Sequence, residues 1–243
     1  MDRIIKIALS VFVVVLITFV ALVGYNGYVE NAYQASLASF YTYNCTITTD
    51  SPLTNVTLFI PVPADRSGNS PIITQFSAQE MPGVPSAWRT LLYDTGKSTM
   101  VKVTIPSLVP PAGTTHEHPY TVTFSTNTSS HKLIDTRNPV ENSPVFRPVT
   151  DPAAAECKGS VSTSDQRKCY SYLTSIYADY QADPNASVSI TSAIRGTNRW
   201  NLFGPLENAY DTDIYILMLG ENHGWTTARG YLETGTGPDD PVQ

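Results

Sequence analysis

An uninterrupted apolar run near the start of the chain constrains this sequence more than any other feature. Ile7–Val23 contains no charged residue, and as a helix it spans about 26 Å, close to the thickness of the hydrocarbon core of a bilayer. Arg3 and Lys6 precede the run, and no Lys or Arg follows it until Arg66. The positive-inside rule therefore predicts a single-pass cell-membrane protein with its N-terminus in the cytoplasm and residues 29–243 outside.

Two alternative interpretations of the same run remain open. A secretory signal peptide also begins with basic residues, but cleavage requires small residues after the apolar stretch. Ala21-Leu22-Val23 does not provide them, and Ser36-Leu37-Ala38 provides them too far downstream. A pilin-like filament subunit also begins with an apolar helix followed by a β domain, but residues 2–6 lack the glycine and early glutamate of a pilin processing site. We therefore expect a membrane anchor that is retained.

The composition of the remaining chain favours β-structure. Charged residues make up only 15% of the 243 residues, the formal net charge is −6, and the chain contains 18 Pro and 14 Tyr. Thr and Tyr favour strands, and frequent Pro divides a chain into short elements. The acidic balance excludes the basic surface of a nucleic-acid-binding protein. The expected fold class is all-β, an antiparallel β-sandwich after one N-terminal transmembrane helix.

This interpretation divides the chain into four regions. Residues 1–28 form the cytoplasmic N-terminus and the transmembrane anchor, residues 29–39 a stalk, residues 40–236 a β-rich extracellular domain and residues 237–243 a flexible tail. A weak similarity between Tyr41–Thr57 and Tyr170–Val188, each with an aromatic-x-aromatic strand followed by a turn and a sequon, suggests two similar halves at 40–135 and 156–236.

Alternation of apolar and polar residues predicts the individual strands. A first hairpin is expected from Phe40–Thr48 and Asn55–Val62, joined by the turn Asp50-Ser51-Pro52. A second is expected from Trp88–Tyr93 and Thr99–Ile105. Further strands are predicted at Tyr120–Ser125, Val188–Ile194, Tyr210–Leu219 and Gly230–Glu233. The spacing in Cys169–Gln181 suits a strand or a helix, and its aromatic content and the turn that follows favour a strand.

Three cysteines bear on the compartment. Cys157 and Cys169 bracket a short polar stretch, and in an exported chain this spacing predicts a disulfide that stabilises the fold by about 2–3 kcal/mol. Cys45 is left over and is expected to be a buried free thiol, although its pairing with either of the others stays open.

Four sequons are candidate glycosylation sites. They begin at Asn127, Asn55, Asn185 and Asn44. The content of Asn, Ser and Thr alone predicts about three such sites, so their number is not evidence of modification. Asn127 is the best candidate because it lies between strands. Asn44 is the weakest because Cys45 occupies the middle position of its sequon and its strand is expected to be internal.

A search for catalytic chemistry assigns no catalytic, cofactor-binding or metal-binding residue. His116 and His118 lie two apart, but a metal needs a third ligand and the Pro-rich context indicates a solvated loop. Glu221–Trp225 combines an acid, an imidazole and an aromatic ring, an arrangement more typical of a turn in the absence of a nucleophile motif.

The three tryptophans have two interpretations. Their flat rings suit the stacking of sugar rings, and Trp200 and Trp225 are the candidate ligand-stacking residues. Burial in the core is the simpler explanation for Trp88 and for tryptophans in general.

The run Asn55–Pro63, together with Gly196–Trp200 and Gly220–Gly230, resembles uncharacterised membrane-anchored surface proteins of methanogenic archaea. The resemblance covers most of the outer domain and implies an envelope β-sandwich without catalytic residues. The resulting hypothesis is a single-pass cell-surface protein with a structural or binding role in the envelope, with envelope proteins or glycans as partners. The alternatives are a surface carbohydrate-active or metal-assisted hydrolase and the filament subunit.

Overall fold

The structure is a computed structural model that describes residues 2–77, 81–95, 98–158 and 167–235. The chain divides into two compact units. The first contains the residues up to Ala38 together with Arg199–Glu207, and the second contains Ser39–Asn198 and the described residues from Asn208 onward. The predicted tail at 237–243 lies outside the described residues.

The first unit is dominated by one long helix. Helix α1 (Asp2–Ser36) has 35 residues, and its mean hydropathy reaches 2.9 over a window in which no residue is buried by protein. Gly24 and Gly27 do not interrupt it, so most of the predicted stalk is a continuation of the same helix. The other part of this unit is the tip of a β-hairpin.

The second unit contains most of the ten strands, of which β8 and β9 continue into the hairpin tip. They are β1 (Ala38–Thr49), β2 (Leu53–Pro61), β3 (Arg89–Asp94), β4 (Thr99–Leu108), β5 (Tyr120–Ser130), β6 (Thr150–Ala154), β7 (Cys169–Gln181), β8 (Ser187–Asn201), β9 (Pro205–Leu219) and β10 (Asn222–Glu233). Two short helices, α2 (Ile73–Ser77) and α3 (Pro139–Asn142), lie in the connections.

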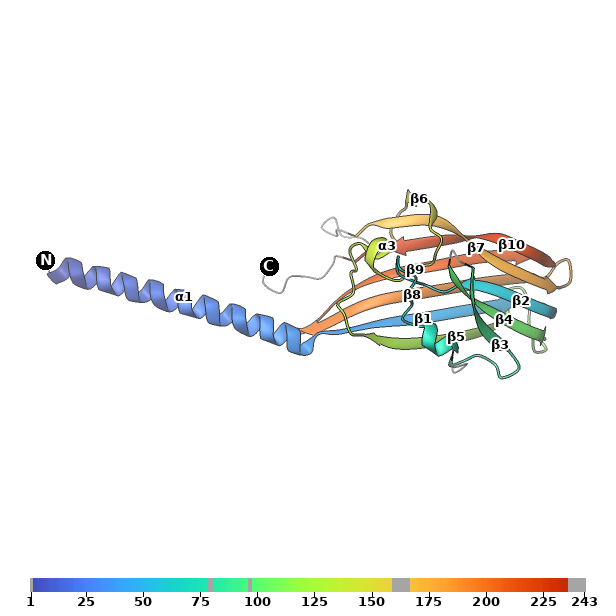
Figure 1. Ribbon diagram of the computed structural model, residues 1–243, viewed down its shortest axis with the longest axis horizontal. Coiled ribbons are helices and arrows are strands. Elements are labelled where there is room, and N and C mark those ends of the chain that lie inside the picture. The colour runs from blue at the N-terminus through green and yellow to red at the C-terminus, as the bar shows by residue number, and fades with distance from the viewer. Residues whose placement is uncertain (1, 78–80, 96–97, 159–166, 236–243) are drawn as a thin grey trace. The chain divides into compact units, whose positions relative to one another are not determined.

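These strands form one sheet in the order β3-β4-β2-β7-β10-β9-β8-β1-β5, with β6 added beside β7 (Figure 1). Strands β1, β2, β3 and β6 each pair antiparallel with a neighbour. This arrangement confirms the predicted fold class. The sheet is not divided into the two facing layers of a simple sandwich. It curls into a half-barrel, so that one face becomes concave.

The first predicted hairpin is wrong. β1 and β2 follow each other in the chain, yet β1 pairs with β5 and β8, whereas β2 pairs with β4 and β7. The alternation identified both strands correctly, but alternation carries no information about the partner of a strand. The second predicted hairpin, β3 with β4, is confirmed, with Tyr93 opposite Met100. The strand at Cys169–Gln181 is also confirmed.

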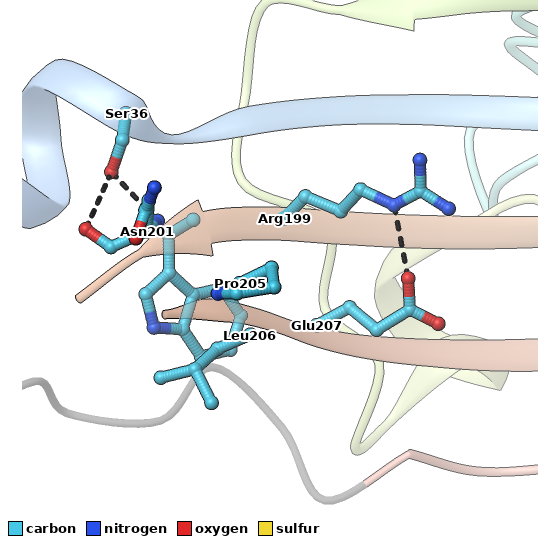
Figure 2. A pocket seen from close by; sticks show the side chains of 7 residues that line it. Ser36, Arg199, Asn201, Pro205, Leu206 and Glu207 are labelled. Carbon is cyan, nitrogen blue, oxygen red and sulfur yellow. Dashed lines mark hydrogen bonds and ion pairs between the residues drawn. The ribbon is translucent and has the colours of Figure 1, made fainter. Parts of the chain in front are cut away.

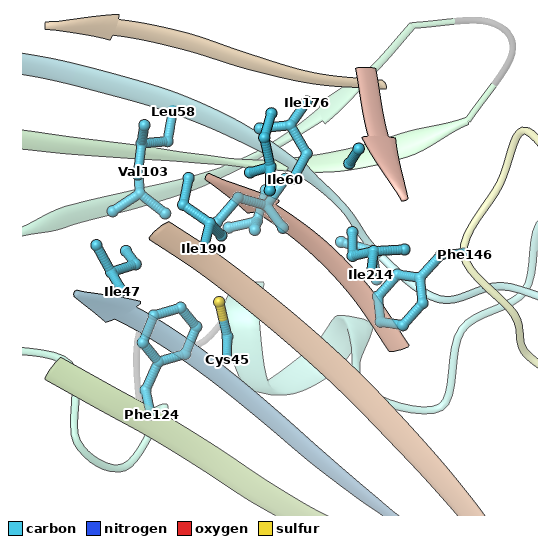
Figure 3. Packing of buried hydrophobic residues seen from close by; sticks show 14 of the residues in the cluster. Cys45, Ile47, Leu58, Ile60, Val103, Phe124, Phe146, Ile176, Ile190 and Ile214 are labelled. Atoms are coloured by element: carbon cyan, nitrogen blue, oxygen red, sulfur yellow. The ribbon is translucent and has the colours of Figure 1, made fainter. Parts of the chain in front are cut away.

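The hydrophobic core fills the concave face. Along most of the strands, inward-pointing residues alternate with outward-pointing ones. The inward residues are mostly aliphatic, with Phe124 among them (Figure 3), and several tyrosines belong to the same core. The connections around α2 and α3 contribute Ile72, Phe76 and Phe146 to the same core. Cys45 is also buried there as a free thiol, and burial raises its pKa to about 12, which suppresses its reactivity.

One buried amide ties three segments of this unit together. The Asn198 side chain is 0% exposed. Its Oδ1 accepts hydrogen bonds from Ser39 Oγ (2.7 Å) and from the Ile134 backbone N–H (3.0 Å). Its Nδ2 donates to the Ile134 carbonyl and to Asn208 Oδ1, both at 2.8 Å. The four hydrogen bonds use the full capacity of the amide.

Cys157 and Cys169 form the predicted disulfide, with their Cα atoms 5.2 Å apart. Cys169 is the first residue of β7, so the bond attaches the preceding segment to the start of a strand. Ala155 also donates its backbone N–H to the Cys169 carbonyl at 2.9 Å. The disulfide therefore reinforces a local connection within the sheet.

Candidate functional site on the outer face of the sheet

The two candidate stacking tryptophans have different environments. Trp200 is 5% exposed and meets the ring of Tyr33 edge-on at 5.7 Å, within the first unit. It lines an open cavity of about 550 Å³ near Ser36 and Asn201 (Figure 2). Trp225 belongs to the second unit and is 58% exposed. Trp88 is buried in the core. Of the three, Trp225 presents its ring to solvent.

Trp225 ends a line of four aromatic side chains that crosses the outer face of the sheet, which we call the aromatic row: Tyr93, Phe59, Tyr177 and Trp225. Neighbouring rings meet edge to face at centroid distances of 5.4, 5.3 and 5.5 Å. Phe59 pairs directly with Tyr177, and Tyr177 with Trp225, across adjacent strands. Lys102 Nζ lies 5.6 Å from the centroid of Phe59.

The row arises from strand alternation. In β2, Leu58 and Ile60 point into the core, so Phe59 between them points outward. The same alternation places Tyr177 between the buried Ile176 and Ala178. An outward position in an antiparallel sheet normally carries a polar residue. Each edge-to-face pair contributes about 0.5–1.5 kcal/mol beyond the area it buries. At 54% and 58% exposed, Tyr93 and Trp225 leave the ends of the row open to solvent.

Further exposed leucines and one tyrosine extend the apolar character of this face. Leu91 lies on β3, the strand that carries Tyr93. Tyr215, Leu217 and Leu219 lie on β9, the strand next to β10. Because the residues that alternate with them, Ile214, Ile216 and Met218, are buried, these three point outward. The outer face therefore carries apolar side chains on several strands.

A charged cluster lies beside the row. His223 is directly opposite Asp179, two residues along from the pair Trp225 and Tyr177. His223 Nδ1 lies 2.7 Å from Asp179 Oδ1, and Nε2 lies 3.7 Å from a carboxylate oxygen of Glu221. The hydrogen bond to Asp179, and after it the attraction of both carboxylates, raises the pKa of His223 above its ordinary value of 6.5.

The sequence placed Glu221–Trp225 in a turn, and this was wrong for most of the segment. β10 begins at Asn222, so His223 and Trp225 are strand residues on one face. Strand geometry explains why the two side chains point the same way. Asp179 and Tyr177 belong to another strand far away in the sequence, and only the pairing of β7 with β10 brings them together. Alternation along a strand determines which side chains point outward, but the neighbours of those side chains depend on which strands pair in the sheet.

All four sequon asparagines are exposed. Asn44 lies on β1 and Asn127 on β5, and both point outward from adjacent strands. Strand β1 lies between β8 and β5, so it is internal to the sheet as expected, yet the Asn44 side chain points to solvent. Asn185 lies in the turn before β8. Asn55 adopts a positive φ of 54° on β2. Each of the four side chains is open to solvent, and their occupancy by glycans remains a prediction.

The predicted histidine pair is placed in a loop before β5. His116 Nδ1 lies 3.0 Å from Asp50 Oδ2, so the side chain is engaged with a carboxylate. Among the residues that the structure describes, no three His, Cys, Asp or Glu side chains are grouped as a metal would require.

Comparison of the chain with models of protein families, with characterised proteins and with solved structures finds no match. The similarity to surface proteins of methanogenic archaea therefore remains a prediction.

Proposed function

We propose that this protein is anchored in the cell membrane by α1 and holds its β domain outside the cytoplasm, where the aromatic row binds another component of the envelope. The observation that carries the proposal is the exposure of α1. A core helix of a soluble protein buries an apolar side, whereas the most apolar window of α1 has no residue buried by protein. An apolar helix of this length that is not covered by protein matches the hydrocarbon core of a bilayer.

The disulfide supports a location outside the cytoplasm. Disulfides persist in oxidising compartments and are rare where thiols are kept reduced. The position of Arg3 and Lys6 before the apolar run gives the same orientation.

The outer face supports a binding role. Aromatic side chains, Met and Arg are enriched where proteins meet, and Trp, Tyr and Arg supply most of the binding energy. The aromatic row lies with exposed leucines and the Asp179–His223 pair on one surface. The leucines offer no flat face to a sugar ring, so this set of side chains favours a protein partner over a glycan. An open sheet face also leaves water around His223, which favours binding over hydrolysis.

Cysteine labelling in intact cells tests the membrane arrangement. A Leu219→Cys variant places a thiol at an exposed position of the β domain, and an Ile4→Cys variant places one before the apolar run without removing a basic residue. A membrane-impermeant maleimide should label the first in intact cells and the second only after permeabilisation. The reverse pattern would contradict the orientation, and recovery of the chain in the soluble fraction would contradict the anchor.

Photo-crosslinking tests the binding face. A photoreactive amino acid at position 225 or 93 should yield a product of one defined mass in native membranes. The same group at position 44, exposed on the outward face of β1, is the matched control and should not. Equal products at all three positions would contradict a specific face. Products that collapse on deglycosylation would identify a glycan partner instead. With a purified partner, Trp225→Ala should weaken binding by about 2 kcal/mol or more, roughly 30-fold.

A further inference from the structure

The hairpin between β8 and β9 ends in an unusually exposed aromatic residue. Phe203 is 75% exposed and has a φ of 57°, a left-handed conformation that favours Gly or Asn. Gly204 donates its backbone N–H to Asn201 Oδ1 (3.2 Å), and Leu202 donates to the Gly204 carbonyl (3.0 Å). The turn therefore directs a large apolar ring into solvent from a residue whose left-handed backbone conformation is unfavourable for a bulky side chain.

This tip lies along the C-terminal part of α1, within the same unit. The rings of Tyr25 and Phe203 are stacked at 6.5 Å with an interplanar angle of 8°, and Tyr28 lies 6.3 Å from Phe203. Further along the helix, Ser36 Oγ accepts a hydrogen bond from the Asn201 backbone N–H at 2.9 Å (Figure 2). The tip of the hairpin is thus the part nearest to the apolar run.

The position of these contacts along α1 defines their distance from the hydrocarbon core of a bilayer that the helix would cross. The apolar run ends at Val23, and at 1.5 Å per residue Tyr25 and Tyr28 lie about 3 and 7.5 Å beyond it. The headgroup region of a bilayer is about 5–8 Å thick on each side of the hydrocarbon core. Phe203, which contacts both tyrosines, lies at headgroup depth. Ser36, about 20 Å beyond Val23, lies clear of the headgroups.

We infer that the tip of the β8–β9 hairpin enters the headgroup region of the membrane that α1 crosses, with Phe203 as a second membrane contact. The inference rests on the proposed anchoring of α1. Aromatic rings are enriched at this depth because they have an apolar body in a partly wet layer. Tyr25 and Tyr28 have 55% and 61% of their surface exposed, and with Phe203 they form one aromatic surface continuous with the apolar run.

Charge along the hairpin agrees with this placement. Arg199 donates from Nε to a carboxylate oxygen of Glu207 at 2.9 Å, and both residues lie in the strands rather than in the turn. On α1, no charged residue occurs between Lys6 and Glu30. The charged groups therefore begin where the headgroup layer ends. An aromatic surface that continues the apolar run without an intervening charge indicates that lipid, and not another protein, contacts the tip of the hairpin.

Spin labelling of the full-length protein in lipid nanodiscs tests the inference. Single cysteines replace Phe203, Val15 in the apolar run, or Leu219 on the β domain, in a chain in which Cys45 is buried. Collision rates with oxygen, which concentrates in lipid, and with a water-soluble nickel chelate report the depth of each label. The label at 203 should meet the chelate several-fold less often than the label at 219, and oxygen less often than the label at 15.

The outcomes separate the two proposals. A label at 203 that meets the chelate as often as the label at 219 overturns the inference. A label at 203 protected from both oxygen and chelate also overturns it, because a second protein surface would then cover the tip. Either result leaves the anchor intact as long as the label at 15 is oxygen-rich. A label at 15 that meets the chelate freely overturns the anchor itself.

Discussion

At the scale of single residues, the fold depends on polar side chains that are fully engaged away from water. Asn198 makes four hydrogen bonds from a side chain with no exposure, and these hold the start of β1, the segment at Ile134 and β9 to β8. Its burial was not predicted from sequence, because the predicted strand ended at Ile194, before this residue, and Asn is mostly found exposed.

The first prediction concerns this amide. Asn198→Asp keeps the shape but replaces the donor Nδ2 with a second acceptor facing the Ile134 carbonyl and Asn208 Oδ1. The free energy of unfolding should fall by about 3 kcal/mol or more, because a buried charged acceptor is left without a donor. Urea denaturation measures the change, and Asn44→Asp on the exposed face is the matched control. Equal effects of the two substitutions would contradict the network.

The second prediction concerns the titration of His223. Because the pKa of this imidazole is raised in the folded protein, the pair with Asp179 favours folding below pH 6.5, and this contribution is lost as the pH rises through the folded pKa. An NMR titration should show a pKa above 6.5 that Asp179→Asn lowers. Glu221→Gln, at the longer distance, should lower it less. A pKa unchanged by Asp179→Asn would contradict the pairing.

At the scale of elements, the sequence indicated strands well and their neighbours poorly. The strand at Cys169–Gln181 followed from its aromatic content and the turn after it, and the hairpin of β3 with β4 followed from alternation and a local turn. The partners of β1 and β2 did not, because pairing across the sheet depends on packing among distant segments. The aromatic row was missed for the same reason, since each ring comes from a different strand.

The third prediction concerns a close approach between two strands. Gly230 of β10 is directly opposite Tyr172 of β7, and a Cβ on Gly230 would collide with the tyrosine ring. Gly230→Ala should destabilise the fold by about 1–3 kcal/mol, since the buried Tyr172 must move and its 2.9 Å hydrogen bond with Thr212 is disturbed. Thermal denaturation checks this, with the exposed Thr227→Ala as control. A smaller residue at 172 should recover part of the loss, and its failure to do so would refute the collision.

The fourth prediction concerns the disulfide at the start of β7. Cys157 and Cys169 are 12 residues apart, and the closed loop should contribute about 2–3 kcal/mol by restricting the unfolded chain. Reductant should lower the melting temperature of the protein and leave that of a Cys157→Ser/Cys169→Ser variant unchanged. An equal shift in both would show that reductant acts elsewhere.

At the scale of the whole molecule, the apolar helix was the most readable feature, because a helix in lipid satisfies its own backbone and needs no partner. The fifth prediction follows from it. Leu16→Arg places a charge at the centre of the apolar run, which costs about 3 kcal/mol in membrane insertion. The variant should move from the membrane pellet toward the soluble fraction after alkaline extraction, whereas Leu16→Val should remain in the pellet. Identical partitioning of the two would contradict the anchor.

The separation of β1 from β2 in the sheet has a consequence for how the chain matures. Four strands from the C-terminal part, β7 to β10, lie between these two N-terminal neighbours. A ribosome releases β1 and β2 early, but their partners β8 and β7 follow more than a hundred residues later. The domain therefore cannot close in stages during synthesis, and contacts of such long range fold slowly. Until β10 emerges, open strand edges remain exposed to other chains, so the domain is most prone to aggregation before its synthesis is complete.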